Sequence, residues 1–142
     1  MSGLVVLLFI LWTGAAVHAQ GIEWETLNKE VLSLYRQGLY DRAVVVANKA
    51  LQVAEQAVGP NHPSVATSLN ILAVLYNTQG QYAQAEPLYK RSLAIKEKAL
   101  GPDHPDVAKS LEFMAGLYRK SGREKGTEAL EKRSAVIRAI KR

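Results

Sequence analysis

The chain has 142 residues, of which 48% are apolar, and it carries a formal net charge of +5. This apolar content excludes a disordered chain and fits one domain with a modest core. The chain has no cysteine, which excludes disulfides, thiolate metal sites, a cysteine nucleophile and the lipidated N-terminal cysteine of a bacterial lipoprotein.

The excess positive charge lies at the C-terminal end of the chain. Residues 119–142 contain nine Lys or Arg and three Glu, whereas residues 1–118 contain nine Lys or Arg and ten Asp or Glu. A charged run of this kind is typical of the solvated outer face of a last helix. The alternative interpretation is an electrostatic patch that binds anionic lipid or nucleic acid.

The first residues are typical of an export signal. An uncharged, largely apolar run extends from Leu4 to Val17, and Val17-His18-Ala19 places small or medium side chains where a signal peptidase cuts. The run is shorter than the roughly 20 apolar residues that span a bilayer. We therefore predict a signal peptide at residues 1–19, a working domain at residues 20–142, and an exported protein that is periplasmic or secreted. Because no Lys or Arg precedes the run, the alternative is an uncleaved N-terminal anchor that tethers the domain to a membrane.

Beyond the signal segment, the chain repeats itself after 42 residues. Residues 59–80 match residues 101–122 at twelve of 22 positions, and the same shift carries Gly38 to Gly80 and Ala43 to Ala85. A fixed period of this length indicates one supersecondary unit that is used several times. We predict three units, at about residues 22–58, 63–100 and 105–140.

The hydrophobic pattern predicts two helices in each unit. In the second unit, apolar or small side chains recur at spacings of three and four, as on one face of a helix. The first helix contributes Val65, Leu69, Leu72, Ala73 and Tyr76, and the second, from about Tyr82 to Ala99, contributes Ala85, Leu88, Tyr89, Leu93 and Ile95. Pro63 suits the first turn of a helix, and Gly80 suits the left-handed conformation that follows a helix end.

The connection between units is the stretch "GPDHPDVA" at residues 101–108, with the near-copy "GPNHPSVA" at residues 59–66. Gly-Pro stops a helix, Asn-His or Asp-His turns the chain, and Pro starts the next helix. The repeat therefore explains His62 and His104 without a catalytic role. Clustered metal ligands, a Gly-rich phosphate loop and a nucleophile motif are all missing from the sequence. We predict no enzyme activity, no cofactor and no metal site.

These residues resemble the tetratricopeptide repeat, in the 42-residue form of kinesin light chains and many bacterial proteins. The resemblance covers roughly residues 22–140 and is carried in the second unit by Leu69, Ala73, Tyr76, Gly80, Tyr82, Ala85, Tyr89 and Leu93. It implies an all-α fold, a right-handed superhelical solenoid of three stacked helix pairs with a concave face. In the last helix, Thr127 and Glu131 replace Ala85 and Tyr89, and a polar outer face is expected for a unit with one neighbour.

In this family the first helix of each pair lines the concave face. By resemblance, the groove would contain Asn28, Leu32 and Tyr35 from the first unit, Asn70, Val74 and Asn77 from the second, and Glu112, Gly116 and Arg119 from the third. An asparagine amide can both donate to and accept from a peptide backbone. A ladder of Asn28 and Asn70 would therefore hold an extended segment without demanding one sequence.

The sequence thus predicts a non-enzymatic protein–protein interaction scaffold, or adaptor, that binds a peptide segment or a partner protein in its groove. A structural, self-associating repeat module is one alternative. A membrane-surface binder that uses the basic C-terminal helix is another. We expect no nucleic-acid partner.

Overall fold

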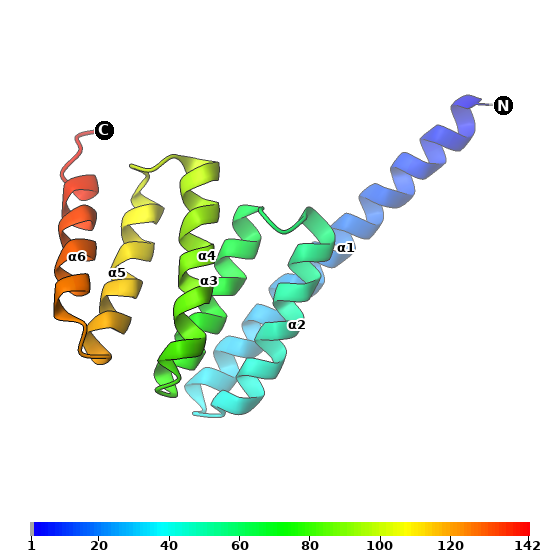
Figure 1. Ribbon diagram of the computed structural model, residues 1–142. Coiled ribbons are helices and arrows are strands. Elements are labelled where there is room, and N and C mark those ends of the chain that lie inside the picture. Colours follow the sequence, from blue (N-terminus) through cyan, green and yellow to red (C-terminus); the bar gives the residue numbers. More distant parts are fainter. Residues whose placement is uncertain (1) are drawn as a thin grey trace. The chain divides into compact units, whose positions relative to one another are not determined.

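The computed structural model describes the backbone of residues 2–142 and the side chains of residues 16–142. This part of the chain forms six helices, which Figure 1 labels in chain order. They are α1 (Ser2–Arg36), α2 (Tyr40–Val58), α3 (Pro63–Thr78), α4 (Tyr82–Leu100), α5 (Pro105–Lys120) and α6 (Glu124–Arg138). Each odd-numbered helix packs against the helix that follows it. The structure confirms the predicted all-α fold of three helix pairs.

The chain divides into two compact units, which are described separately. The first unit ends at Pro60 and contains α1 and α2, and the second begins at Asn61 and contains α3 to α6. The second unit therefore holds the second and third repeats.

In the first unit, large side chains of α1 face small side chains of α2. The buried residues are Leu27, Val31 and Leu34 on α1, and Ala43, Ala47, Ala50, Val53 and Ala54 on α2. Alanine brings little volume between two helices, so the backbones approach closely and the larger side chains of α1 fill the space. The first repeat forms a packed pair although Val31 and Leu34 stand where the second repeat has Ala73 and Tyr76.

Helix α1 continues without a break from Ser2 to Arg36, across the predicted cleavage point after Ala19. The predicted signal peptide falls largely on residues 1–15, whose side chains lie outside the described residues, so this assignment stays a prediction. Within the described part of the chain, no helix combines the length and the apolar character that crossing a membrane requires.

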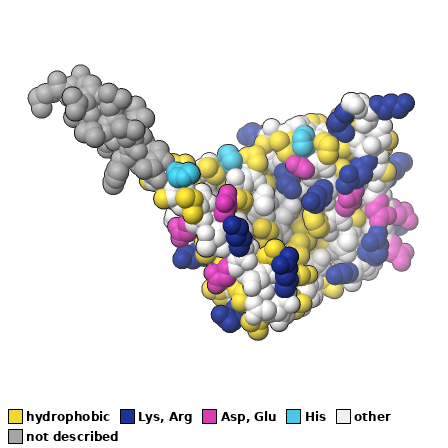
Figure 2. Space-filling model, turned by 180° about the vertical axis from the view of Figure 1, so that it is seen from behind, with side chains coloured by type: hydrophobic (Ala, Val, Ile, Leu, Met, Phe, Trp, Pro, Cys, Tyr) yellow, Lys and Arg dark blue, Asp and Glu magenta, His cyan; other side chains and the backbone are white. Residues whose placement is uncertain are grey.

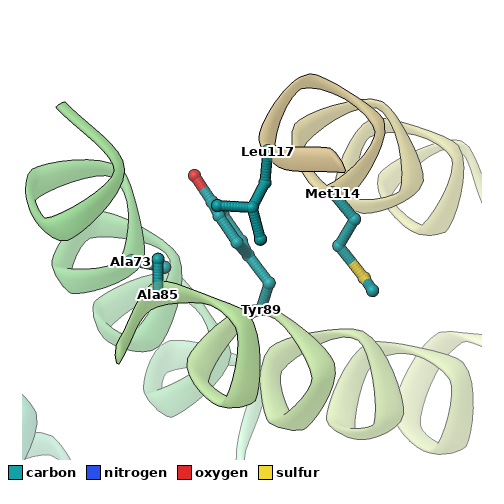
Figure 3. Close-up of a cluster of buried hydrophobic side chains, with 5 residues drawn as sticks. All are labelled: Ala73, Ala85, Tyr89, Met114 and Leu117. Atoms are coloured by element: carbon teal, nitrogen blue, oxygen red, sulfur yellow. The ribbon is translucent and has the colours of Figure 1, made fainter. Parts of the chain in front are cut away.

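In the second unit, one buried cluster joins three helices. Its members are Ala73 on α3, Ala85 and Tyr89 on α4, and Met114 and Leu117 on α5. In Figure 3 the two alanines lie against each other, and the Tyr89 ring lies beside Leu117. Only 1% of Tyr89 is exposed, and its ring stacks on Phe113 with 6.2 Å between the ring centres. This cluster holds the second and third repeats together.

The loops between repeats are built from the residues that the sequence singles out. Gly59 and Gly101 follow α2 and α4 with φ angles of +84° and +92°. Residues other than glycine rarely adopt such positive φ angles. Pro63 and Pro105 are the first residues of α3 and α5, where the missing N–H of proline costs nothing. The predicted helix from Tyr82 to Ala99 matches α4 within one residue.

Candidate functional site

The predicted groove residues of the second repeat share one face of α3. Asn70, Val74 and Asn77 are spaced at four and three residues and therefore lie above one another on the helix. Only 9% of Asn70 is exposed, and Val74 and Asn77 are half-buried. The amides of Asn70 and Asn77 are thus largely covered, on a helix whose other buried residues are mostly apolar.

The side-chain oxygens of these two amides have no hydrogen-bond partner. Oδ1 of Asn70 and Oδ1 of Asn77 are both buried, and neither accepts a hydrogen bond within the described part of the chain. A buried acceptor left unpaired costs about 1–3 kcal/mol. Because no bond holds either oxygen in place, rotation about χ2 can turn it toward an N–H donor that approaches α3 from outside.

The first unit presents a similar amide. Asn28 Nδ2 donates to the Trp24 carbonyl oxygen at 3.0 Å, and Asn28 Oδ1 is buried without a partner among the described residues. Leu32 is 48% exposed, and the Tyr35 ring meets Tyr40 edge-on with 5.4 Å between the ring centres. Asn28 and Asn70 belong to different units, so the ladder between them stays a prediction.

The predicted residues of the third repeat are bonded to α6. Glu112 accepts hydrogen bonds from Arg138 Nη2 at 2.9 Å and from Ser134 Oγ at 2.7 Å, and Arg119 pairs with Glu131. The Arg138 guanidinium, followed by the Ser134 hydroxyl, lowers the pKa of Glu112 to about 2. Glu112 and Arg119 therefore already have partners within their own helix pair, unlike the amides of α3.

The same pairing accounts for much of the basic C-terminal end. Four arginines there form ion pairs with glutamates, namely Arg119 with Glu131, Arg123 with Glu86, Arg133 with Glu97 and Arg138 with Glu112. In Figure 2, dark blue and magenta side chains lie side by side at the C-terminal end of the molecule. The acids offset these four arginines locally, so the remaining positive charge of this end is carried mainly by the exposed lysines Lys120, Lys125, Lys132 and Lys141.

The structure also shows a carboxylate in the second unit, Glu86, whose role was not predicted from the sequence. Glu86 on α4 accepts hydrogen bonds from Tyr118 Oη at 2.8 Å and forms ion pairs with Arg123 at 2.9 Å and Lys90 at 2.8 Å. Hydrogen bonds from Arg123 and then Lys90 lower its pKa to about 2, against the opposing effect of burial. The Arg123 guanidinium also lies over the Tyr118 ring, 3.8 Å from its centre. The signal in the sequence is Arg123, which stands where the second repeat has Gln81.

The position of the Tyr118 ring depends on Gly126 of α6. A Cβ atom at Gly126 would lie 2.6 Å from Tyr118 Cδ2, which is much shorter than a normal contact between carbon atoms. The last helix therefore carries glycine where the tyrosine ring crosses it. This glycine lets the ring reach Glu86 and support Arg123.

Both loop histidines cap helices. His62 Nδ1 accepts from the Ser64 backbone N–H at 3.2 Å, and His104 Nδ1 accepts from the Asp106 N–H at 3.1 Å. Among the described residues, no three His, Asp or Glu side chains are grouped so that they could hold a metal ion. The observed role of the two rings is thus to satisfy an N–H group at a helix start.

The chain repeats a helix pair, with alanines where the two helices cross and a tyrosine between successive pairs. This arrangement defines the class of helix-pair repeat proteins. A family model for the tetratricopeptide repeat matches residues 25–98 and 72–134. The chain belongs to the tetratricopeptide repeat family.

Solved structures show the same fold. A crystal structure of BtubC (BKLC) from P. vanneervenii is 24% identical, with a TM-score of 0.76 over 82% of this chain and 46% of that one. A putative kinesin light chain from Podosopora anserina with nearly identical TPR-like repeats is 23% identical, with a TM-score of 0.73 over 81% of this chain and 55% of that one. This chain thus spans about half the length of these relatives. No curated protein matches it.

Proposed function

We propose that this chain is a protein–protein interaction scaffold that binds an extended peptide segment of a partner along the face of α3 that carries Asn70, Val74 and Asn77. Tetratricopeptide repeats commonly serve as such scaffolds and are generally not enzymes. The observation that carries the proposal is the Asn70 side chain, which is nine-tenths buried and whose Oδ1 has no partner in the described part of the chain. A peptide backbone N–H would supply the missing donor.

The spacing of the two amides suits an extended chain. Asn70 and Asn77 are two helical turns apart, which corresponds to about 10 Å along the helix axis. Three residues of an extended peptide cover about the same distance. A bound segment would therefore place backbone groups that are three residues apart against the two amides. The amides would bind the peptide backbone, and contacts beside them would select the side chains of the peptide.

A binding experiment tests this use of the amides. A displayed library of random 12-residue peptides would be selected on the full chain, and the enriched peptides would be titrated against the Asn70→Ala/Asn77→Ala variant. We expect binding to weaken at least about tenfold, since each lost hydrogen bond contributes about 1 kcal/mol. Neither oxygen accepts a hydrogen bond within the described residues, so the fold should tolerate both changes.

The matched control is Asn48→Ala, which removes an exposed asparagine from α2 and should leave binding unchanged. Enriched peptides that bind the double variant as tightly as the original chain would contradict the proposal. A selection that enriches no peptide would contradict it as well.

We also propose that the protein is exported and acts after residues 1–19 are removed. The support is the uncharged apolar run that ends at Val17 and the small side chain of Ala19, as at the cleavage site of a signal peptide. Intact-mass measurement of the protein from its source cell should give a mature chain that begins at Gln20. A chain that keeps its first residues and fractionates with membranes would instead favour the uncleaved anchor.

A further inference from the structure

Helices α4 and α6 run in the same direction and finish at the same end of the second unit (Figure 1). Two contacts fix this end. Arg133 of α6 pairs with Glu97 of α4 at 2.7 Å, and the guanidinium of Arg142 donates to the backbone carbonyl of Asp103 in the loop that follows α4. The last turns of α4 and α6 and the C-terminal residues therefore form one continuous surface.

The exposed apolar side chains of the second unit gather at this end. In residues 61–142, the large apolar side chains classed as exposed are Leu100, Val136 and Ile140, at 37%, 60% and 39%. Leu100 lies one helical turn beyond Glu97, and Val136 lies one turn beyond Arg133, so the ion pair brings them near each other. Single exposed apolar residues are common on proteins, whereas a group of them marks a surface that contacts something apolar.

Cations without an acidic partner surround these side chains. Lys98, Lys141 and Arg142 are exposed and have no recorded ion pair within the described residues. Three acids at this end already have a basic neighbour, namely Glu97 with Arg133, Glu112 with Arg138, and Asp106 with Lys96. Asp103 is the remaining acid, so this end carries an excess of positive charge. The end patch, as we name this surface, consists of Leu100, Val136, Ile140, Lys98, Lys141 and Arg142.

We propose that the end patch docks on an anionic lipid bilayer, with its three aliphatic side chains in the interface and its three cations at the headgroups. The charge of the patch is complementary to anionic headgroups, which attract Lys and Arg near the membrane surface. The same bilayer accepts apolar side chains just below the headgroups, and the long stems of lysine cross this boundary. A bilayer thus matches both parts of the patch at once.

Docking through this end is compatible with the peptide site proposed above. The end patch lies where α4 and α6 finish, whereas Asn70 and Asn77 lie along α3, which runs from Pro63 to Thr78. The face of α3 therefore stays free when the helix ends meet a membrane. The protein would hold a peptide partner at a lipid surface.

Binding of the full chain to phosphatidylcholine vesicles, with and without phosphatidylglycerol, tests this proposal. We expect binding to strengthen when phosphatidylglycerol is present and to weaken steeply with added salt. The variant Lys98→Gln/Lys141→Gln should weaken binding to the anionic vesicles about 25-fold, since each basic residue at an anionic surface contributes about fivefold.

The matched control is Lys120→Gln/Lys125→Gln, which removes the same charge from exposed lysines at the opposite end of the second unit. Helix α6 has 15 residues and is therefore about 22 Å long. This length is about twice the distance over which salt at 0.1 M screens a charge, about 10 Å. We expect the control variant to bind the anionic vesicles nearly as well as the original chain.

A label tests the apolar part of the patch. The chain has no cysteine, so Val136→Cys can be labelled alone with a dye whose emission shifts to the blue in apolar surroundings. We expect this shift on anionic vesicles for Val136→Cys and not for Lys125→Cys. Residues 1–19 are the same in every variant, so their own affinity for lipid does not alter the comparisons. The proposal is overturned by no gain in binding from phosphatidylglycerol, by equal weakening in the two double variants, or by a label at position 136 that stays in water when the protein is bound.

Discussion

Replacing Tyr89 with alanine should lower the free energy of unfolding by about 3–5 kcal/mol, as for other large aromatic side chains in cores. Tyr89 is 1% exposed and lies in the cluster that joins α3, α4 and α5. Alanine would remove the ring that stacks on Phe113 and leave a cavity between two repeats. Because this cluster joins α4 to α5, we expect the loss to loosen α5 and α6 from α4.

Urea unfolding followed by far-UV circular dichroism measures this effect. The matched control is Glu131→Ala, which changes the same repeat position in α6, where the side chain is 47% exposed and pairs with Arg119. An exposed ion pair contributes at most about 1 kcal/mol, so this variant should change the unfolding midpoint little. Equal effects of the two substitutions would contradict the assignment of Tyr89 as the centre of the interface between repeats.

Replacing Glu86 with glutamine should cost about 1.5–3 kcal/mol at neutral pH, the range for a hydrogen bond to a charged group. The glutamine keeps the shape but removes the charge that Arg123 and Lys90 neutralise. The folded state lowers the pKa of Glu86 from its ordinary value of 4.5 to about 2. Its stabilising contribution is therefore fully present above about pH 4.5 and is lost as the pH falls through about 2.

Unfolding free energies of the original chain and the Glu86→Gln variant would be compared from pH 7 to pH 2. We expect a constant difference down to about pH 4.5 and a difference that closes below it. The matched control is Glu128→Gln, at the equivalent position of α6, where the side chain is exposed and no ion pair is recorded within the described residues. A difference that persists at pH 2, or an equal effect of the control, would contradict the role of the Glu86 charge.

The helices and loops follow from the sequence because their determinants are local. Pro63 and Pro105 begin helices and Gly80 ends one with a φ of +74°, which depends on backbone sterics alone. The burial of Ala73, Ala85 and Tyr89 follows from helical spacing and from the small volume of alanine. The cap made by each histidine was not predicted, since a ring nitrogen that accepts from the backbone leaves no periodic signal.

The candidate site is less accessible to sequence reasoning because it depends on side-chain orientation. Because they occupy equivalent positions of the repeat, Glu112 and Arg119 were predicted to line the groove together with Asn70 and Asn77. In the structure, Glu112 pairs with Arg138 of α6 and Arg119 pairs with Glu131 of α6. Arg138 lies 26 positions from Glu112 and Glu131 lies 12 positions from Arg119, and a comparison at a shift of 42 residues does not reveal such pairs. The buried state of Asn70 Oδ1 likewise depends on packing around α3 rather than on its own repeat position.

At the C-terminal end, most arginines are paired with acids and most lysines are not. The arginines at 119, 123, 133 and 138 bind glutamates, whereas Lys120, Lys125, Lys132 and Lys141 are exposed and have no recorded ion pair within the described residues. Arginine suits fixed pairs because its planar fork matches a carboxylate, and lysine remains hydrated and mobile. Amine-directed labels or surface coupling would therefore reach these lysines and spare the arginines that fasten α6, so the protein can be attached through this end with its last repeat intact.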